Sequence, residues 1–129
     1  MSAIDRTHGT IAWHDLTVPD ADKVRDFYAA VVGWRAEPVD MGGYADFNMV
    51  SPATGHPAAG VCWRRGINAD LPAQWLMYVN VPDVDAAARK CTEMGGSVIA
   101  GPRNMGAARY CVIRDPAGAV CALYTPSEV

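Results

Sequence analysis

The chain has 129 residues, of which 50% are hydrophobic and 19% are charged, a composition typical of one globular domain and not of a disordered segment. Its formal net charge of −3 gives no basic surface for a phosphate backbone, so nucleic-acid binding is not expected. No apolar run approaches the ~20 residues that span a bilayer, and the N-terminus lacks a secretory signal pattern. We therefore expect a cytoplasmic protein with no membrane partner.

The first part of the chain reads as a strand, a helix and three further strands. Aromatic and β-branched residues predict the first strand over Thr10–Val18. A helix then begins at Asp20 and ends at Gly33, and apolar side chains at helical spacing give it one face to bury: Val24, Phe27, Tyr28, Val31 and Val32. The three short strands that follow lie between turn-forming residues: Glu37–Val39, Tyr44–Val50 and Ala58–Trp63.

After a connecting segment, Arg64–Pro72, the same order of elements returns. A strand over Ala73–Val81 precedes a helix that begins at Asp83 and ends at Gly95-Gly96. Three more strands follow, separated by turns at Gly101-Pro102 and Asp115–Gly118: Ser97–Ala100, Ala107–Ile113 and Val120–Tyr124.

The two parts are related by a shift of 63 residues, which pairs Asp20 with Asp83 and Gly33 with Gly96. Aspartates that open helices and glycines that close them mark the ends of a supersecondary unit, so their joint recurrence indicates a duplicated module. We expect one domain over residues 1–129, with module one at about 8–64 and module two at about 72–126.

Two patterns carry a resemblance to a known family. In WHDLTVPDADKVRDFYAAVVGW a strand precedes V-x-D and a helix with Phe-Tyr, and in RDPAGAVCALY the turn D-P-x-G precedes the last strand. With these patterns the duplicated β-α-β-β-β module resembles the vicinal oxygen chelate superfamily, which includes glyoxalase I, bleomycin-resistance proteins and extradiol dioxygenases. The resemblance implies an α+β fold of two tandem βαβββ modules that form an incomplete barrel with the helices outside and a ligand cleft within.

The resemblance also implies positions for one divalent metal ion. Metal-dependent members use His, Gln or Glu on the first and last strand of each module. Counting seven residues before the V-x-D aspartate and seven after the D-P-x-G aspartate finds Trp13, Leu76 and Ala122, and the 63-residue shift adds Ala59. None of these side chains can coordinate a metal, so we expect no metal and no other cofactor.

Two residues next to these positions keep chemical alternatives open. A β-bulge would bring His14 into the cleft with Asp15 as an oxygen donor, whereas regular alternation would place it under the helix with Leu16. Asp15 is also the candidate general base, because a carboxylate beside Trp13 would be partly desolvated. Its structural alternative is a hydrogen-bonded aspartate with no catalytic role.

Alternation along the strands selects the side chains that would line a cleft. Aromatic groups with polar tips suit a planar ligand, and Tyr44 and Trp63 are expected at its rim. We expect Arg109 to meet a ligand anion or to pair with an acidic side chain such as Asp46. The predicted ligand-binding residues are Trp13, Thr17, Tyr44, Trp63, Leu76, Tyr78, Asn80, Arg109, Ala122 and Tyr124.

The sequence is compatible with two functions. The first is a metal-free protein that binds an organic small molecule, as the bleomycin-resistance branch of the resembled family does. The second is a lyase or isomerase, acting either through Asp15 without a metal or through an atypical metal shell that includes His14. By analogy with the family we expect a homodimer.

Overall fold

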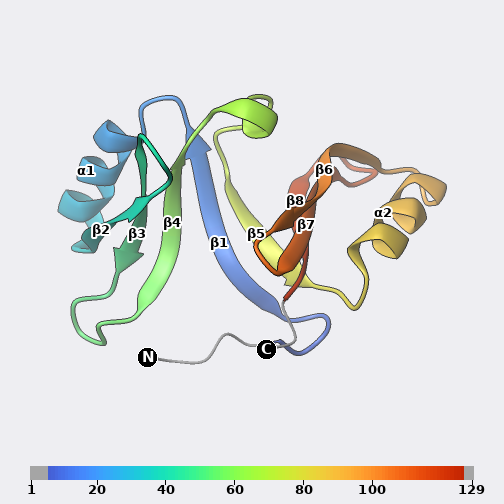
Figure 1. The fold of residues 1–129 in the computed structure, drawn as a ribbon, viewed down its shortest axis with the longest axis horizontal. Coiled ribbons are helices and arrows are strands. Elements are labelled where there is room, and N and C mark those ends of the chain that lie inside the picture. Colours follow the sequence, from blue (N-terminus) through green and yellow to red (C-terminus); the bar gives the residue numbers. More distant parts are fainter. Residues whose placement is uncertain (1–5, 127–129) are drawn as a thin grey trace. The chain divides into compact units, whose positions relative to one another are not determined.

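A computed structural model describes residues 6–126 as an α+β fold of two βαβββ modules (Figure 1). This arrangement confirms the fold class that the sequence predicts. The first module contains β1 (Ile11–Val18), α1 (Ala21–Val32), β2 (Arg35–Asp40), β3 (Ala45–Val50) and β4 (Pro57–Trp63). A short 3-10 helix, η1 (Gly66–Asn68), precedes the second module, which contains β5 (Trp75–Asn80), α2 (Val84–Glu93), β6 (Ser97–Met105), β7 (Ala108–Arg114) and β8 (Val120–Thr125).

Contacts divide the described chain into a first unit, residues 14–75, and a second unit, residues 6–13 with 76–126. The start of β1 belongs to the second unit because its backbone bonds to Asn80. The N–H of Gly9 donates to the Asn80 carbonyl at 2.7 Å, and the Asn80 N–H donates to the Thr10 carbonyl at 2.8 Å. The predicted module boundaries, 8–64 and 72–126, differ from these units mainly at this strand.

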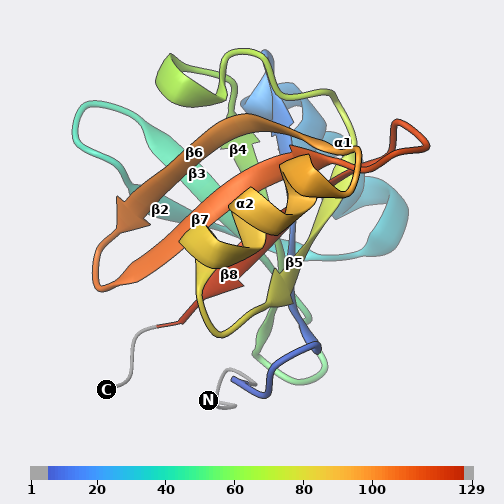
Figure 2. The same ribbon diagram turned by 90° about the vertical axis from the view of Figure 1, so that its right-hand side faces the viewer.

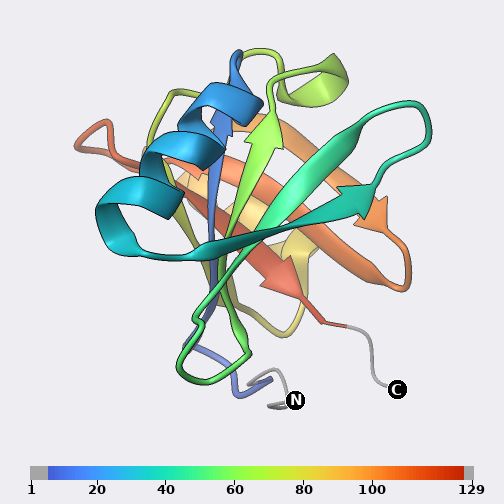
Figure 3. The ribbon, with the colours of Figure 1, turned by 90° about the vertical axis from the view of Figure 1, so that its left-hand side faces the viewer.

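The sheet of the first unit has the strand order β2-β3-β4-β1, with β1 and β4 parallel and the other pairs antiparallel. Helix α1 packs on one face of this sheet (Figure 3). We call this the helix face and the other the opposite face, for both units. Apolar side chains that alternate along the strands form the core of the helix face together with Ala21 of α1: Leu16, Val18, Phe47, Met49 and Val61.

The sheet of the second unit has the order β5-β8-β7-β6, again with one parallel pair, β5 and β8. Helix α2 crosses β6, β7 and β8 on its helix face (Figure 2). The core under this helix is smaller and consists of Val84, Ala88 and Cys111, with partly buried side chains around it. The two units thus share one topology, as the 63-residue repeat predicts.

The two helices differ at their first turns. The Asp83 carboxylate accepts a hydrogen bond from the Ala86 N–H at 3.2 Å, so the predicted cap is confirmed for α2. Asp20 makes no side-chain cap hydrogen bond, and the predicted cap is wrong for α1. The end of α1 at Gly33 is confirmed, because this residue takes a left-handed φ of 87°.

The apolar stripe of α1 is only partly buried, which corrects the sequence prediction. Val24 and Tyr28 pack against the core, but Phe27 is 57% and Val31 65% exposed. The stripe covers a wider arc of the helix than the sheet contacts, because it uses both three- and four-residue spacings.

The predicted turn at Gly101-Pro102 is also wrong. Strand β6 continues through a cis Gly101-Pro102 peptide to Met105, with register shifts on both sides of Ala100, and reverses at Gly106. Proline fits here because β6 is an edge strand, where a missing backbone N–H removes no necessary ladder bond.

Over residues 6–126, neither helix has the length and apolar character needed to cross a membrane.

Candidate functional site

Three tyrosines gather on the opposite face of the second unit. Tyr78 stacks on Tyr110 with ring centroids 6.4 Å apart, and meets Tyr124 edge-on at 6.2 Å. Tyr110 and Tyr124 are register partners, and they alternate with Cys111 and Leu123, which face α2. Tyr78 and Tyr110 are only 7% and 6% exposed. Tyr110 was not selected from the sequence, although its alternation with Cys111 could have indicated this face.

Three other predicted residues share the tyrosine face. The register pairs Tyr78 with Ala122 and Asn80 with Tyr124, and Leu76 lies two residues before Tyr78. Leu76, Asn80 and Ala122 are fully buried. The amide nitrogen of Asn80 donates to the Thr10 hydroxyl at 3.0 Å, which ties the start of β1 to β5. The structure therefore brings together the predicted residues of β5 and β8.

The opposite face of the first unit is more polar. The Cys62 thiol lies within hydrogen-bonding reach of the Asp15 and Asp46 carboxylates. Burial, followed by the two negative charges, raises the pKa of this thiol far above its ordinary range. Thr17 is buried on the same face, opposite Cys62 in the parallel ladder. Asp15 thus lies where alternation predicts, whereas the predicted place of Trp13, which belongs to the second unit, stays a prediction.

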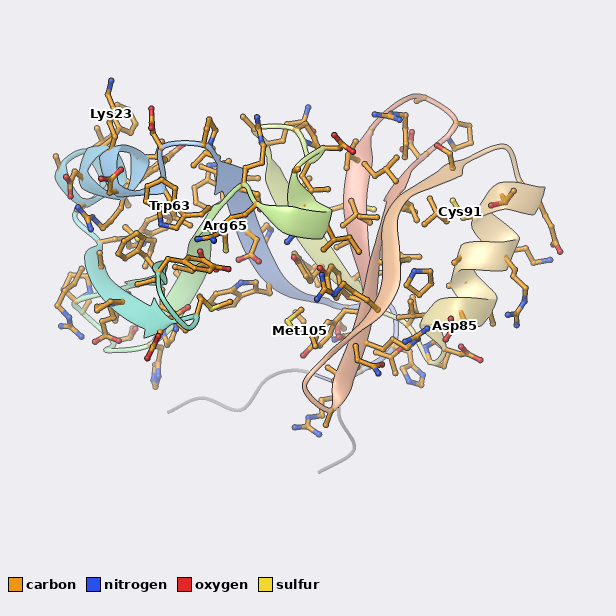
Figure 4. All side chains as sticks on the ribbon, turned by 45° about the horizontal axis from the view of Figure 1, so that its top comes forward. Lys23, Trp63, Arg65, Asp85, Cys91 and Met105 are labelled. Carbon is orange, nitrogen blue, oxygen red and sulfur yellow. The ribbon has the colours of Figure 1, made fainter. Side chains whose placement is uncertain are left out.

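One of the two predicted rim residues, Trp63, lies elsewhere. Trp63 is on the helix face with Val61, packs against the core there, and donates its indole N–H to the Ala45 carbonyl at 2.9 Å. Its predicted place at the rim of the opposite face is wrong, because its alternation follows Val61 and not Cys62. Tyr44 precedes β3, and the guanidinium of Arg65, which is labelled in Figure 4, lies over its ring, 3.7 Å from the ring centroid.

Arg109 pairs with an acidic residue, but not with Asp46. Its Nε and one terminal nitrogen donate to the two carboxylate oxygens of Asp85 at 2.8 and 3.0 Å, and the other terminal nitrogen donates to Asn104 at 2.9 Å. Asp85 lies in the first turn of α2 (Figure 4), and the guanidinium lowers the pKa of its carboxyl. Arg109 therefore joins the hairpin to the helix, and its place on the helix face does not support the predicted contact with a ligand.

The strand registers correct one of the four metal positions. Asp15 pairs with Gly60 in the first unit, whereas Tyr78 pairs with Ala122 in the second. Asp15 and Tyr78 are 63 positions apart, whereas their partners, Gly60 and Ala122, are 62 positions apart. Gly60, and not Ala59, therefore corresponds to Ala122. Glycine offers no side-chain donor either. Because none of the four positions carries a donor side chain, these residues do not fit the metal that the resemblance implies. Over residues 6–126, no group of three or more His, Cys, Asp or Glu side chains is placed to hold a metal ion.

His14 lies on the helix face of the first unit. It lies beside Trp34 and Trp75, which pack against the core of this face, so it takes the place that regular alternation predicts and not the one that a bulge would give it. His14 is exposed and lines a hollow of about 300 Å³ with Trp34, Ala58, Ala59 and Trp75. His14 and Asp15 point to different faces and cannot form one metal shell together.

The chain is similar to known proteins over most of its length. The family model of the Glyoxalase/Bleomycin resistance protein/Dioxygenase superfamily matches residues 10–123. "Putative glyoxylase CFP32" of Mycobacterium bovis is 30% identical over 120 residues, which is 92% of this chain and 45% of that protein. "Anthracycline biosynthesis protein DnrV" of Streptomyces peucetius is 34% identical over 128 residues, which is 90% of this chain and 46% of that protein.

The chain therefore spans about half the length of these curated relatives. Among solved structures, a variant of Streptomyces coelicolor methylmalonyl-CoA epimerase in complex with 2-nitronate-propionyl-CoA matches with a TM-score of 0.55 at 19% identity. The match covers 95% of this chain and 98% of that chain, and at this identity it shows a common fold.

Proposed function

Because the chain belongs to the glyoxalase/bleomycin resistance protein/dioxygenase superfamily, we propose that it binds a planar organic small molecule without using a metal ion. The observation that carries this proposal is the group formed by Tyr78, Tyr110 and Tyr124 on the opposite face of the second unit. Tyrosine rings give flat apolar contact area, and their hydroxyl groups give polar contacts that orient a ligand.

The side chains at the family's metal positions support the metal-free part of the proposal. Trp13, Gly60, Leu76 and Ala122 supply no oxygen, nitrogen or sulfur donor suited to a divalent ion. Leu76 and Ala122 are instead buried apolar side chains that pack beside the tyrosines. Such a face favours binding by stacking and burial over chelation of substrate oxygens.

The ligand class follows from the shape of the aromatic group and from one relative. Tyr78 packs its buried ring against one stacked and one edge-on neighbour, and the edge-on ring, Tyr124, is half-exposed, so a fused aromatic ring system can stack against it. A relative that is 34% identical bears the name anthracycline biosynthesis protein. We therefore propose an anthracycline-like polycyclic aromatic compound as the ligand.

Titration with an anthracycline tests the proposal, with the fluorescence of the compound and the Tm of the protein as readouts. We expect saturable quenching and a higher Tm, because a ligand that binds only the folded chain stabilises it. Tyr124→Ala should weaken binding about tenfold or more, as removal of an aromatic contact does.

Met77→Ala is the matched control, because Met77 neighbours Tyr78 in β5, points to the other side of the strand and is 40% exposed. The control should bind like the wild type. Equal affinities of Tyr124→Ala and the wild type, or no saturable binding of the anthracycline, would contradict the proposal.

A second candidate function is a metal-free lyase or isomerase, favoured by the position of Asp15. Its carboxylate lies beside Cys62, and the second carboxylate of Asp46 is close to the same thiol. A carboxylate on a half-buried face can act as a general base. Incubation with a panel of 2-oxo compounds distinguishes the functions, because turnover that disappears in Asp15→Asn supports the enzyme, whereas binding without turnover supports the first proposal.

A further inference from the structure

The helix face of the first unit contains a hollow that the proposed function does not use. Its walls are the rings of Trp34, which follows the helix-ending Gly33, and Trp75, which begins β5. The two ring centroids lie 6.0 Å apart, with their planes at 74°. Both indoles are only half-buried. Two half-buried indoles that converge on a hollow are unusual apolar surface for a protein to leave open to solvent.

Tyr28 holds the indole of Trp75 in place. The indole N–H donates to the Tyr28 hydroxyl at 3.0 Å, and the two rings meet edge-on with centroids 5.2 Å apart. Tyr28 in turn packs against the core of the helix face, and the centroid of its ring lies 6.0 Å from that of Trp34. This support fixes the walls before any ligand arrives, so binding would not have to order them.

The floor and rim of the hollow come from small residues and one polar group. Ala59 and Ala58 of β4 end at Cβ, which leaves the space between the indoles unfilled. His14 neighbours Ala59 in the parallel ladder, one step before the Asp15–Gly60 pair. Among residues 6–126, no side chain or backbone group makes a hydrogen bond or ion pair with its exposed imidazole.

We propose that this hollow is a second binding site, for a single aromatic ring that carries a hydroxyl or carboxylate group. The ring would stack on one indole and meet the edge of the other, as the 74° angle between them allows. The oxygen substituent would hydrogen-bond to the His14 imidazole at the rim. The volume of about 300 Å³ suits one ring and lies at the small end of ligand pockets.

Phenol and toluene test the proposal as a matched pair, because they have nearly the same size and differ in the oxygen. The probes are titrated to millimolar concentration into the ¹⁵N-labelled full chain, and the indole N–H resonances are followed by NMR. We expect saturable shifts of Trp34 and Trp75, assigned by Trp34→Phe and Trp75→Phe. The indole of Trp63, which bonds to Ala45, should not shift.

Two substitutions separate the parts of the site. Ala58→Leu should fill the hollow from its exposed rim and weaken both probes tenfold or more, while Ala53→Leu, in the exposed turn after β3, should not change binding. His14→Leu should weaken phenol about threefold to tenfold, the effect of one lost hydrogen bond, and leave toluene unchanged.

Each remaining outcome overturns the proposal. Absence of saturable shifts for both probes would show that the hollow binds no single ring. Binding that survives Ala58→Leu would place the probes elsewhere, and equal weakening of phenol and toluene by His14→Leu would exclude a hydrogen bond to the imidazole. None of these results bears on the anthracycline test, because the tyrosine face belongs to the other unit.

Discussion

Cys62 and Asp15 lie diagonally across the β1–β4 ladder, on the opposite face of the first unit. Burial and the carboxylates of Asp15 and Asp46 all oppose loss of the thiol proton, which is why the pKa of Cys62 is raised. The thiolate is the form that reacts with alkylating reagents. Cys62 should therefore be alkylated slowly in the folded chain, and the rate of alkylation should depend on the neighbouring carboxylates.

Asp15→Asn removes one of the two charges and keeps the shape of the side chain. We expect iodoacetamide to alkylate Cys62 severalfold faster in this variant at about pH 8, because its pKa falls toward that of an ordinary thiol. Mass spectrometry of the Cys62 peptide measures the rate. Asp22→Asn, an exposed change in α1, is the control, and equal rates in the two variants would show that Asp15 does not act on Cys62.

The ion pair of Asp85 and Arg109 predicts a dependence of stability on pH. The pKa of Asp85 is lowered in the folded chain, so its contribution is present above the unfolded-state value of about 4 and is lost as the pH falls through the lowered value. Wild type should therefore resist urea more than Asp85→Asn at about pH 7, and the difference should disappear at about pH 2.

Both side chains of this pair are partly exposed, so the difference is expected to be small. Urea unfolding of both proteins at several pH values measures it. If the difference in stability between the two proteins stayed constant across the acidic range, the ion pair would not be its cause.

At the scale of elements, the sequence predicts strands and helices well wherever the signal is local. Alternation within β5 and β8 places Leu76, Tyr78 and Tyr124 on the face where the structure has them. The prediction fails where tertiary contacts decide which side chains are buried. In α1, Phe27 fits the helical period but is largely exposed. The continuation of β6 past Gly101 likewise depends on pairing with β7, which the sequence does not display.

Gly101 is the point in β6 where a side chain cannot be placed. Its φ is 78°, and a Cβ would lie 2.9 Å from the carbonyl oxygen of Tyr110. We expect Gly101→Ala to lower the free energy of unfolding by about 2 to 4 kcal/mol, because backbone strain and a clash act together. Urea unfolding of the purified variant measures the loss.

Gly106→Ala is the matched control for this element. Gly106 also has a positive φ, 60°, but no heavy atom of the described chain lies within 4 Å of the Cβ position. Strain alone should cost about 1 kcal/mol there. If Gly101→Ala lowered the free energy of unfolding no more than Gly106→Ala does, the close approach to Tyr110 would not contribute to the loss of stability.

At the scale of the whole molecule, the repeat predicts two modules but not the pairing of their strands. A fixed shift of 63 residues selects Ala59, whereas the ladder selects Gly60, because a shift of one residue in β4 exchanges its two faces. Contacts between elements far apart in the sequence also explain why Asp85, not Asp46, meets Arg109. The assignment of Trp13, Leu76 and Ala122 to the family's metal positions rests on motif spacing and stays a prediction.

Removal of metal should leave the protein unchanged. The side chains at Trp13, Gly60, Leu76 and Ala122 give a divalent ion no donors, so elemental analysis should find well below one equivalent per chain. Treatment with EDTA should alter neither the Tm nor the affinity for an anthracycline. Stoichiometric zinc, nickel, iron or manganese whose removal lowers the Tm would contradict this expectation.

The distribution of chromophores gives the two units different optical signals. Three of the four tryptophans, Trp34, Trp63 and Trp75, lie in the first unit, whereas three of the five tyrosines, with the stacked pair of Tyr78 and Tyr110, lie in the second. Indole emission therefore reports mainly on melting of the first unit, and the tyrosine bands of near-ultraviolet circular dichroism take their larger share from the second. A single heating experiment that records both would show whether the duplicated halves lose their structure in one cooperative transition or in two.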